Sequence, residues 1–263
     1  MLTAQWTPGP SHEAATRAGL RLGDRGTHSS RTIMLAELRE LLSAVPTEAG
    51  RESYAEAIVR DNALGKATTS SRRLTNQRLG ELYGLDPSLP LFRVFRRVWA
   101  VDEPGRPLLA LLCALARDPL LRASAEAVLS LAPGAELIRG ALIKTLRQAT
   151  GSRLNDAILD KVARNAGSSW SQAGHLEGRV RKIRRLVEPT PGSVAFVVWL
   201  GSLQRLSGED LLRTPWARVL DRSPAALLDL ALRAKQLGLL QARSGGNVIE
   251  IDARGLDPFE RAG

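Results

Sequence analysis

The sequence has little of what most metal sites and disulfide frameworks require. It contains a single cysteine, Cys113, inside the apolar run LLALLCALA. No disulfide can therefore form within the chain, and we interpret this thiol as a small core residue. The three histidines, His12, His28 and His175, lie far apart, and no His/Cys spacing typical of a metal site occurs. These scarcities predict a protein that holds neither a metal nor a cofactor.

Signals for catalysis and for membrane insertion are also missing. There is no Gly-rich phosphate loop of the Walker or dinucleotide type. The acidic residues Glu136, Asp156, Asp160 and Glu177 fall among cations on predicted helices instead of clustering as a nuclease metal site requires. The longest apolar stretch, 107–116, is too short for a bilayer, which needs about 20 residues, and no secretory signal opens the chain. We expect a non-enzymatic, cytoplasmic protein without a membrane partner.

Aromatic residues are scarce as well, at 4%, whereas 44% of the chain is hydrophobic and rich in alanine and leucine. This composition favours helices over sheets. A chain of 263 residues can hold one large domain or two to three small ones. We predict a mainly α fold, a multi-helix bundle with one or two winged helix-turn-helix-like units and short β-hairpins.

Helical periodicity and turn residues divide the chain into four segments. Residues 1–30 carry Pro, Gly, Ser and scattered charges and are expected to be a flexible leader. Residues 31–133 are expected to be an N-terminal helical domain. Its predicted helices cover residues 31–45, 50–64, 69–83 and 89–100, followed by an apolar helical hairpin over 107–117 and 119–132.

The third segment, 134–190, has the pattern of a winged helix-turn-helix. Two amphipathic helices are predicted over 136–149 and 153–165. Gly167 permits a turn, and Ser168 or Ser169 could then cap a third helix. The strand-like run RVRKIRRLVEP follows. Three helices, a turn before the third and a basic extended segment are the order of that motif.

The fourth segment, 191–263, is predicted to be a helical unit that ends in a second wing. Its apolar run SVAFVVWL favours a helix but could also form a strand. Ser223 and Pro224 open another helix. The stretch GLLQARSGGNVIEIDAR predicts a β-hairpin that turns at Gly245-Gly246.

Positive charge exceeds negative charge, but not uniformly along the chain. Lys and Arg number 37 against 27 Asp and Glu, a formal net charge of +10. Residues 134–190 carry 11 cations and 5 anions, net +6, and residues 60–100 carry 8 and 3, net +5. Residues 191–263 carry 9 and 8, net +1. Such an excess favours a polyanionic partner, nucleic acid before membrane.

The predicted winged unit supplies most of the candidate DNA-binding residues. Five cations lie in the extended segment: Arg179, Arg181, Lys182, Arg184 and Arg185. Because alternate residues of a strand share a face, Arg179 and Arg181 should point one way and Lys182 and Arg184 the other. The polar side of the preceding helix offers Ser169, Gln172 and His175 for base edges or phosphates. The alternative is a solvated basic face beside an ordinary helical bundle.

A second candidate phosphate contact is the stretch DNALGKATTSSRRLTNQRLGELYGL. The N-terminus of a helix offers free N–H groups and the positive end of its dipole, which suits an anion. Arg72 and Arg73 lie in the first turn, where a cation is mildly unfavourable unless an anion is present, and Arg78 follows. The alternative is a simple N-cap by the hydroxyl residues. If both basic regions bind nucleic acid, they should form one continuous surface.

The same stretch resembles the BrxA family of BREX phage-defence systems. The resemblance rests on RDNALGKATTSSRRLTNQRLGELYGLD and on LLALLCALARDPLLRASAEAVL, and more weakly on Trp216 and the late GLL. It implies a largely helical, non-enzymatic DNA-binding protein with winged-helix-like parts. Such a protein acts beside the methyltransferase, ATPase and phosphatase-like components of a defence system.

Our leading hypothesis is a sequence-tolerant protein that binds double-stranded DNA mainly through phosphates. Three alternatives stay open. The chain could be a protein–protein adaptor within a defence complex, an RNA-binding helical protein, or a transcriptional repressor, which would need a symmetric dimer.

Overall fold

The chain is mainly helical and contains two short antiparallel hairpins, which confirms the predicted fold class. The computed structural model describes Trp6, residues 11–245 and residues 248–257. Among the helices of these residues, none combines the length and the hydropathy that a bilayer crossing requires.

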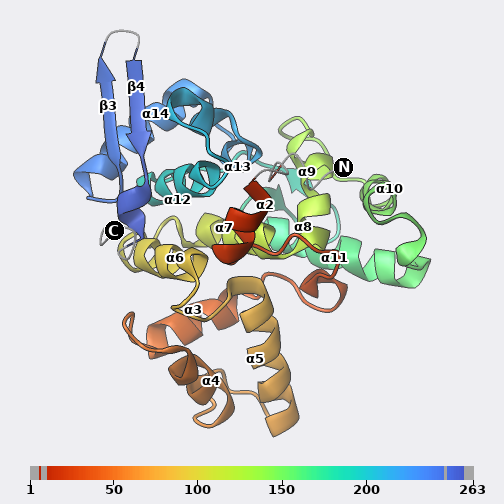
Figure 1. Ribbon diagram of the computed structural model, residues 1–263. Helices are drawn as coiled ribbons and strands as arrows, with labels where there is room; N and C mark the ends of the chain where they lie inside the picture. Colours follow the sequence, from red (N-terminus) through yellow and green to blue (C-terminus); the bar gives the residue numbers. More distant parts are fainter. Residues whose placement is uncertain (1–5, 7–10, 246–247, 258–263) are drawn as a thin grey trace.

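Helices α3, α4 and α5 form a lobe that projects from the rest of the molecule (Figure 1). They span Leu35–Ala44, Arg51–Val59 and Thr69–Tyr83. Helix α5 has its predicted range, whereas α3 begins later than predicted, at residue 35 and not 31, and α4 ends earlier, at residue 59 and not 64. Their inward faces are apolar at helical spacing, and the side chains buried there include Leu38, Leu41, Leu42, Tyr54, Ile58, Leu79 and Leu82. The lobe therefore owes its shape to the periodicity that the sequence displays.

The centre of the molecule is built around helix α12, Pro191–Ser202. It contacts α6 (Pro90–Val101), α7 (Arg106–Arg117) and α14 (Pro224–Gln236). Because SVAFVVWL is apolar on every side, this helix can be buried all round. The sequence left helix and strand open for this run, and the structure shows a helix. Thr190 starts the helix through a reciprocal capping box with Ser193.

The segment after α7 forms two short helices in place of the single helix expected over 119–132. These are α8, Pro119–Ala123, and α9, Ala125–Leu129, with Ser124 between them. The Oγ of buried Ser124 donates a hydrogen bond to Leu121 O and accepts one from the indole N–H of Trp170. A tertiary contact thus accompanies the break in the helix.

The flexible leader expected over residues 1–30 is wrong for the residues that the structure describes. Residues 11–30, which we call the strap, contain helix α2 (His12–Arg17) and the 3-10 turn η2 (Thr27–Ser29). Ala15, Ala18, Leu20 and His28 of the strap are buried. Its backbone bonds to the body, from Leu91 N–H to Ala18 O at 2.8 Å and from Arg21 N–H to Ala116 O at 3.0 Å.

The described C-terminal residues form a helical unit with the predicted hairpin. After α12 come η4 (Gly208–Arg213), α13 (Pro215–Arg218), α14 (Pro224–Gln236), β3 (Gln241–Gly245), β4 (Val248–Asp252) and η5 (Arg254–Leu256). Strands β3 and β4 pair antiparallel, with Ala242 opposite Ile251. Figure 1 shows this hairpin projecting beside α14. Of the predicted turn, Gly246 lies outside the described residues.

The predicted segments do not have separate cores. Buried apolar side chains from the strap, from 31–133, from 134–190 and from the C-terminal unit belong to one continuous cluster. The predicted boundaries near 133 and 190 fall in turns between helices, but helix α12 of the last segment packs inside the helices of the second.

Candidate nucleic-acid interface

The basic segment 134–190 folds as two helices followed by a two-stranded ribbon. The elements are α10 (Arg139–Thr150), α11 (Asp156–Gln172), β1 (Leu176–Glu177) and β2 (Ile183–Arg184). The extended residues before α10 join the ribbon, because Glu136 bridges Ile183 and Leu137 N–H donates to Lys182 O at 2.8 Å. Helices α8 and α9 pack against α10. The order of short helices, extended residues, two helices and ribbon is similar to that of a winged helix-turn-helix.

Local sequence signals explain where α11 begins and which side it buries. The Asn155 side chain caps the helix by accepting a hydrogen bond from Ile158 N–H at 2.9 Å, and Asp156 adds negative charge to the first turn. The buried side includes Leu159, Val162 and Trp170. Helix α11 is therefore amphipathic and is anchored to the core along its whole length.

The turn expected at Gly167 does not form, and this changes which residues face outward. Residues 156–172 make one continuous helix, so the second and third predicted helices are the same element. The remaining helix of the motif comes from α8 and α9, before residue 134. Gly167 is used for close packing instead: a Cβ there would lie 3.3 Å from the side chain of Lys182. The helical register then turns Ser169 and Trp170 into the core.

Three of the predicted DNA contacts are corrected, because their side chains are fully or almost fully buried. These are Ser169, His175 and Arg184. Arg184 forms a two-pronged ion pair with Asp221, with Nη1 3.0 Å from Oδ2. A guanidinium that is 1% exposed and paired in this way is not available to a phosphate, and removing one partner would leave the other charge buried and uncompensated.

His175 is held beside the same ion pair. Its Nε2 donates to Val219 O at 2.8 Å, and its ring packs edge-on against Trp170. Burial lowers the pKa of His175 to about 4, although nearby Asp221 acts in the opposite direction. The ring is therefore neutral at pH 7, and its Nδ1 has no hydrogen-bond partner in the described chain.

Ser169 belongs to a buried polar cluster that has the residue types of a catalytic triad. Its Oγ lies 2.8 Å from His28 Nε2, and His28 Nδ1 lies 2.8 Å from Asp118 Oδ2. Burial alone would raise the pKa of Asp118, but the His28 ring and backbone N–H groups lower it. A serine nucleophile must reach a substrate carbonyl. Here Ser169 and His28 are 0% exposed, and we interpret the cluster as the bond that fastens the strap to α11.

The other predicted residues of this segment lie at the surface and have mixed partners. Gln172 accepts a hydrogen bond from Leu35 N–H at 3.1 Å, and Lys182 Nζ donates to Ser171 Oγ at 2.9 Å.

The arginines of the loop lie at the surface. Arg181 pairs with Glu136 at 2.8 Å and Arg185 with Glu177 at 2.6 Å. The side chain of Arg179 is exposed and has no partner among the described residues. Arg179, Arg181, Lys182 and Arg185 thus remain accessible to an anion.

The ribbon carries its cations on a tight loop. Gly178 has φ +100°, and a Cβ there would lie 2.1 Å from Arg181 O, so the position requires glycine. At the tip, Val180 is 91% exposed between Arg179 and Arg181. This loop is the wing of the unit.

Sequence reasoning missed the outward ridge of α11. Ala157, Lys161 and Arg164 are exposed and Ser168 is half-buried, at spacings of four, three and four residues. Lys161 has no partner among the described residues, and Arg164 pairs with Asp160 at 3.3 Å. The helical spacing is visible in the sequence, but the expected break at Gly167 hid its continuity.

In the stretch around α5 the hydroxyl residues act as a helix cap, as the alternative interpretation proposed. Thr68 and Ser71 form a reciprocal capping box. Arg72 reaches back to Lys66 O at 3.2 Å, and Arg78 pairs with Glu81 at 2.8 Å. Of the three predicted arginines, Arg73 alone is exposed without a partner among the described residues.

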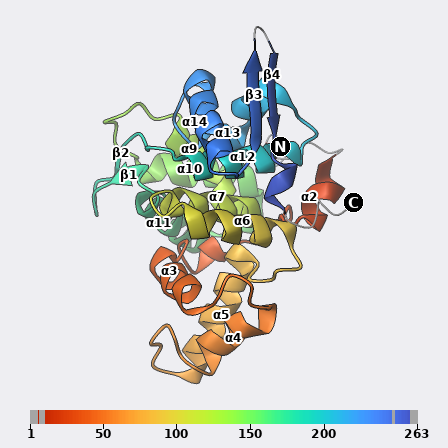
Figure 2. The ribbon, with the colours of Figure 1, turned by 90° about the vertical axis from the view of Figure 1, so that its left-hand side faces the viewer.

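The two predicted basic regions meet only in part, because Arg78 of α5 and Arg153 before α11 line one pocket, whereas the ribbon lies elsewhere. In Figure 2, β1 and β2 lie at the edge of the body, whereas α5 lies in the lobe below it with α3 between them. The ribbon is therefore separate from α5, and the α11 ridge and the wing together form the candidate interface.

Comparisons with known proteins add no identification. No protein-family profile matches the chain, and no curated protein sequence matches it. Within the described residues there is also no group of three or more His, Cys, Asp or Glu side chains that could hold a metal ion.

Proposed function

We propose that this chain is a non-enzymatic protein that binds double-stranded DNA through the winged unit of residues 134–190. In this proposal α11 enters the major groove, and the wing lies on the adjacent backbone. A recognition helix approaches the groove with its N-terminal half and exposes polar residues to it. At about 1.5 Å per residue, the 17-residue α11 is long enough for this role.

The single observation that carries the proposal is the coincidence of the ridge and the wing. Lys161 and Arg164 lie on the outward side of α11, and Arg179 and Arg181 lie on the wing beyond its far end. The segment has 11 cations against 5 anions. DNA phosphates attract such a surface and release counterions on binding.

The ion pairs on this surface do not argue against DNA binding. The side chain of Arg181 is 76% exposed, and that of Arg185 is 53% exposed. Exposed pairs of this kind contribute about 0–1 kcal/mol. A phosphate can therefore replace the carboxylate at little cost.

We place the protein in the cytoplasm, where a reducing environment suits its single buried thiol; burial raises the pKa of Cys113 to about 12. On the resemblance to the BrxA family, we further propose that it serves a BREX-like defence system beside other components of that system. The residues around α5 and α7 support this part of the proposal, and the DNA-binding argument does not depend on it.

The test is a charge-removal pair measured by fluorescence anisotropy with a labelled duplex. Lys161→Ala/Arg164→Ala/Arg179→Ala should weaken binding about 10- to 100-fold and reduce the salt slope by about 2.7. The matched control, Arg233→Ala/Lys235→Ala/Arg243→Ala, removes three exposed charges from the C-terminal unit and should change affinity less than about twofold.

Equal effects of the two triple variants would reject the assignment of the interface. Unlabelled RNA of the same length serves as a competitor in the same titration. Stronger competition by RNA than by duplex DNA would replace duplex DNA with RNA as the partner.

A further inference from the structure

A second cationic site lies apart from the ridge and the wing, where the strap passes between α5 and α7. Two adjoining pockets of about 500 and 510 Å³ share Arg21, Gln77 and Glu81 as lining residues. Six arginines line the two pockets together, against two carboxylates: Arg21, Arg25, Arg51, Arg78, Arg117 and Arg153. The balance of charge within these pockets is strongly positive.

The two carboxylates are already engaged. Glu81 accepts hydrogen bonds from Arg78 at 2.8 Å, from Thr27 at 2.7 Å and from Gln77 at 3.0 Å. Partial burial would raise the pKa of Glu81, but these bonds outweigh it and lower the pKa. Asp86 accepts from Ser88 N–H at 2.9 Å and lies 3.5 Å from Arg51. The charge of Glu81 acts on Arg117, but neither carboxylate forms an ion pair with Arg21 or Arg117 among the described residues.

Arg117 is a fixed positive charge in one wall of the first pocket. It is 9% exposed, and it donates to Glu81 O at 3.0 Å, to Gly80 O at 3.3 Å and to Gly19 O. These bonds hold the guanidinium against the end of α5 and the strap. Burial lowers the pKa of Arg117, and the neighbouring charge of Arg21 acts in the same direction, whereas Cys113 and Glu81 act in the opposite direction.

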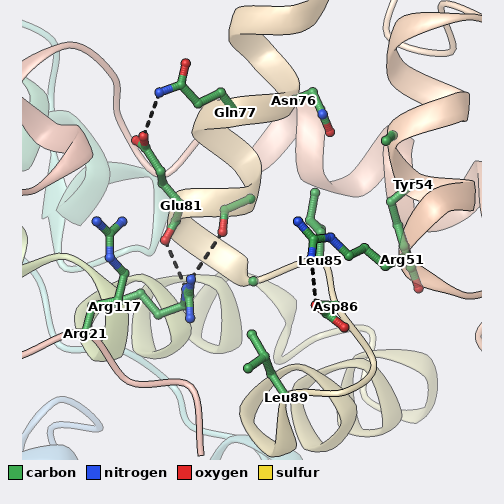
Figure 3. A pocket seen from close by; sticks show the side chains of 13 residues that line it. Arg21, Arg51, Tyr54, Asn76, Gln77, Glu81, Leu85, Asp86, Leu89 and Arg117 are labelled. Carbon is green, nitrogen blue, oxygen red and sulfur yellow. Dashed lines mark hydrogen bonds and ion pairs between the residues drawn. The ribbon is translucent and has the colours of Figure 1, made fainter. Parts of the chain in front are cut away.

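Arg21 lies beside Arg117 and has no ion pair or side-chain hydrogen bond among the described residues. Figure 3 shows both side chains on one side of the pocket, with Arg51 on the other side and Asn76 and Gln77 along α5. Two guanidinium groups placed together without a carboxylate between them repel each other, and an anion that binds both relieves this repulsion.

We infer that the pocket lined by Arg21, Arg51 and Arg117 binds a phosphate group. Guanidinium groups match the oxygens of phosphate with paired, charge-assisted hydrogen bonds. The side-chain amides of Asn76 and Gln77 add neutral donors at the same place.

The adjoining pocket continues past Arg25 to Arg153 and Ile158, at the start of α11. The phosphate belongs either to a free phosphorylated molecule or to a DNA strand that runs on from α11.

The site is tested on the full-length protein with pyrophosphate as the probe and chloride at equal ionic strength as the reference. Pyrophosphate at ten times its Kd should raise the melting temperature by about 3 °C. Arg21→Ala and Arg51→Ala should abolish this shift, and Arg233→Ala should retain it. Arg21 bonds to the body through its backbone N–H and C=O, so its replacement leaves those bonds intact, which circular dichroism checks.

A second arm identifies the source of the phosphate. A duplex that extends past the strap is compared with one that covers α11 alone. If Arg21→Ala abolishes both the pyrophosphate shift and the advantage of the longer duplex, the phosphate is that of DNA. If Arg21→Ala abolishes the shift alone, the site holds a free phosphorylated molecule. A wild-type protein that pyrophosphate does not stabilise, or variants that keep its full shift, would overturn the site whether or not duplex DNA binds at α11.

Discussion

The protein contains two units in which a helix is followed by a β-hairpin, and they differ mainly in charge. The basic unit, residues 134–190, has a net charge of +6, from 11 cations and 5 anions. The neutral unit, residues 191–257, has 8 cations and 7 anions, net +1. Its hairpin has five residues in each strand, against two in each strand of the ribbon. The two units therefore have similar architecture but different surfaces, and our proposal places DNA binding on the basic one.

The two units also differ in how they are anchored. Helix α12 of the neutral unit is buried on all sides and forms part of the central core, whereas α11 keeps one exposed ridge. The ion pair of Arg184 with Asp221 joins the units, with one partner in each. The neutral unit therefore holds the basic unit in place, and the basic unit presents the ridge and the wing.

The largest effect is expected from breaking the ion pair that joins the units. Arg184→Met leaves Asp221 buried without its partner and should reduce the free energy of unfolding by about 3–5 kcal/mol. Urea denaturation measures this change in the free energy of unfolding. The adjacent Arg185→Ala, which removes an exposed pair, should cost less than about 1 kcal/mol. If the two variants were equally stable, Arg184 would have no special structural role. The double variant Arg184→Met/Asp221→Leu should recover part of the loss.

Acid should weaken the same junction through His175. The folded pKa of His175, about 4, is below the ordinary value near 6.5, so the unfolded chain takes up a proton first as pH falls. The stability contributed by the neutral ring is full above about pH 6.5 and is lost as pH falls toward 4. When the pH falls from 7 to 5, protonation of His175 in the unfolded chain should lower the free energy of unfolding by about 2 kcal/mol. Denaturation of wild type and His175→Gln at both pH values checks it; an identical pH dependence would contradict the assignment.

A smaller difference in stability is expected between variants of two buried tryptophans, Trp170 of the basic unit and Trp216 of the neutral unit. The indole N–H of Trp170 donates to Ser124 Oγ at 2.8 Å, whereas that of buried Trp216 has no partner in the described chain. Trp170→Phe loses a hydrogen bond that Trp216→Phe does not, and it should cost about 1 kcal/mol more. The difference in melting temperature between the variants measures it, and the opposite order would show that packing dominates.

The smallest effect is expected from the N-cap residues of α11 and α14, each of which has an exposed face. Asn155 caps α11 and Ser223 caps α14, each through a side-chain oxygen. Replacing either by alanine should cost about 1 kcal/mol of stability. Asn155→Ala should also weaken duplex binding, because the first turn of the proposed recognition helix frays, while Ser223→Ala should leave affinity unchanged. Equal affinities of the two variants for the duplex would count against α11 as the recognition helix.

Much of the fold could be predicted from local pattern. Four features follow from signals within a few residues: the leucine stripe of α3, the bounds of α5, the helix opened by Ser223 and Pro224, and the hairpin of β3 and β4. The concentration of cations in residues 134–190 is likewise a property of the sequence. These features need no knowledge of what packs against them.

The candidate site could be predicted only in part, because burial depends on distant residues. Arg184 looks like its neighbours in the run RVRKIRR, yet Asp221, 37 positions away, draws it into the core. Ser169 looks like a cap, yet His28 of the strap, 141 positions away, makes it part of a buried cluster. No local pattern contains these partners.

By itself the sequence determined that the chain is mainly helical, that its excess positive charge lies in the segments 60–100 and 134–190, and where its C-terminal hairpin forms. Helical periodicity, turn residues and net charge are local properties and survive in any packing. The tertiary structure alone decided that α11 is continuous through Gly167, that the strap is packed against the body, and which arginines face solvent. Those outcomes depend on side chains that meet only after folding, when burying a polar group requires a partner for it.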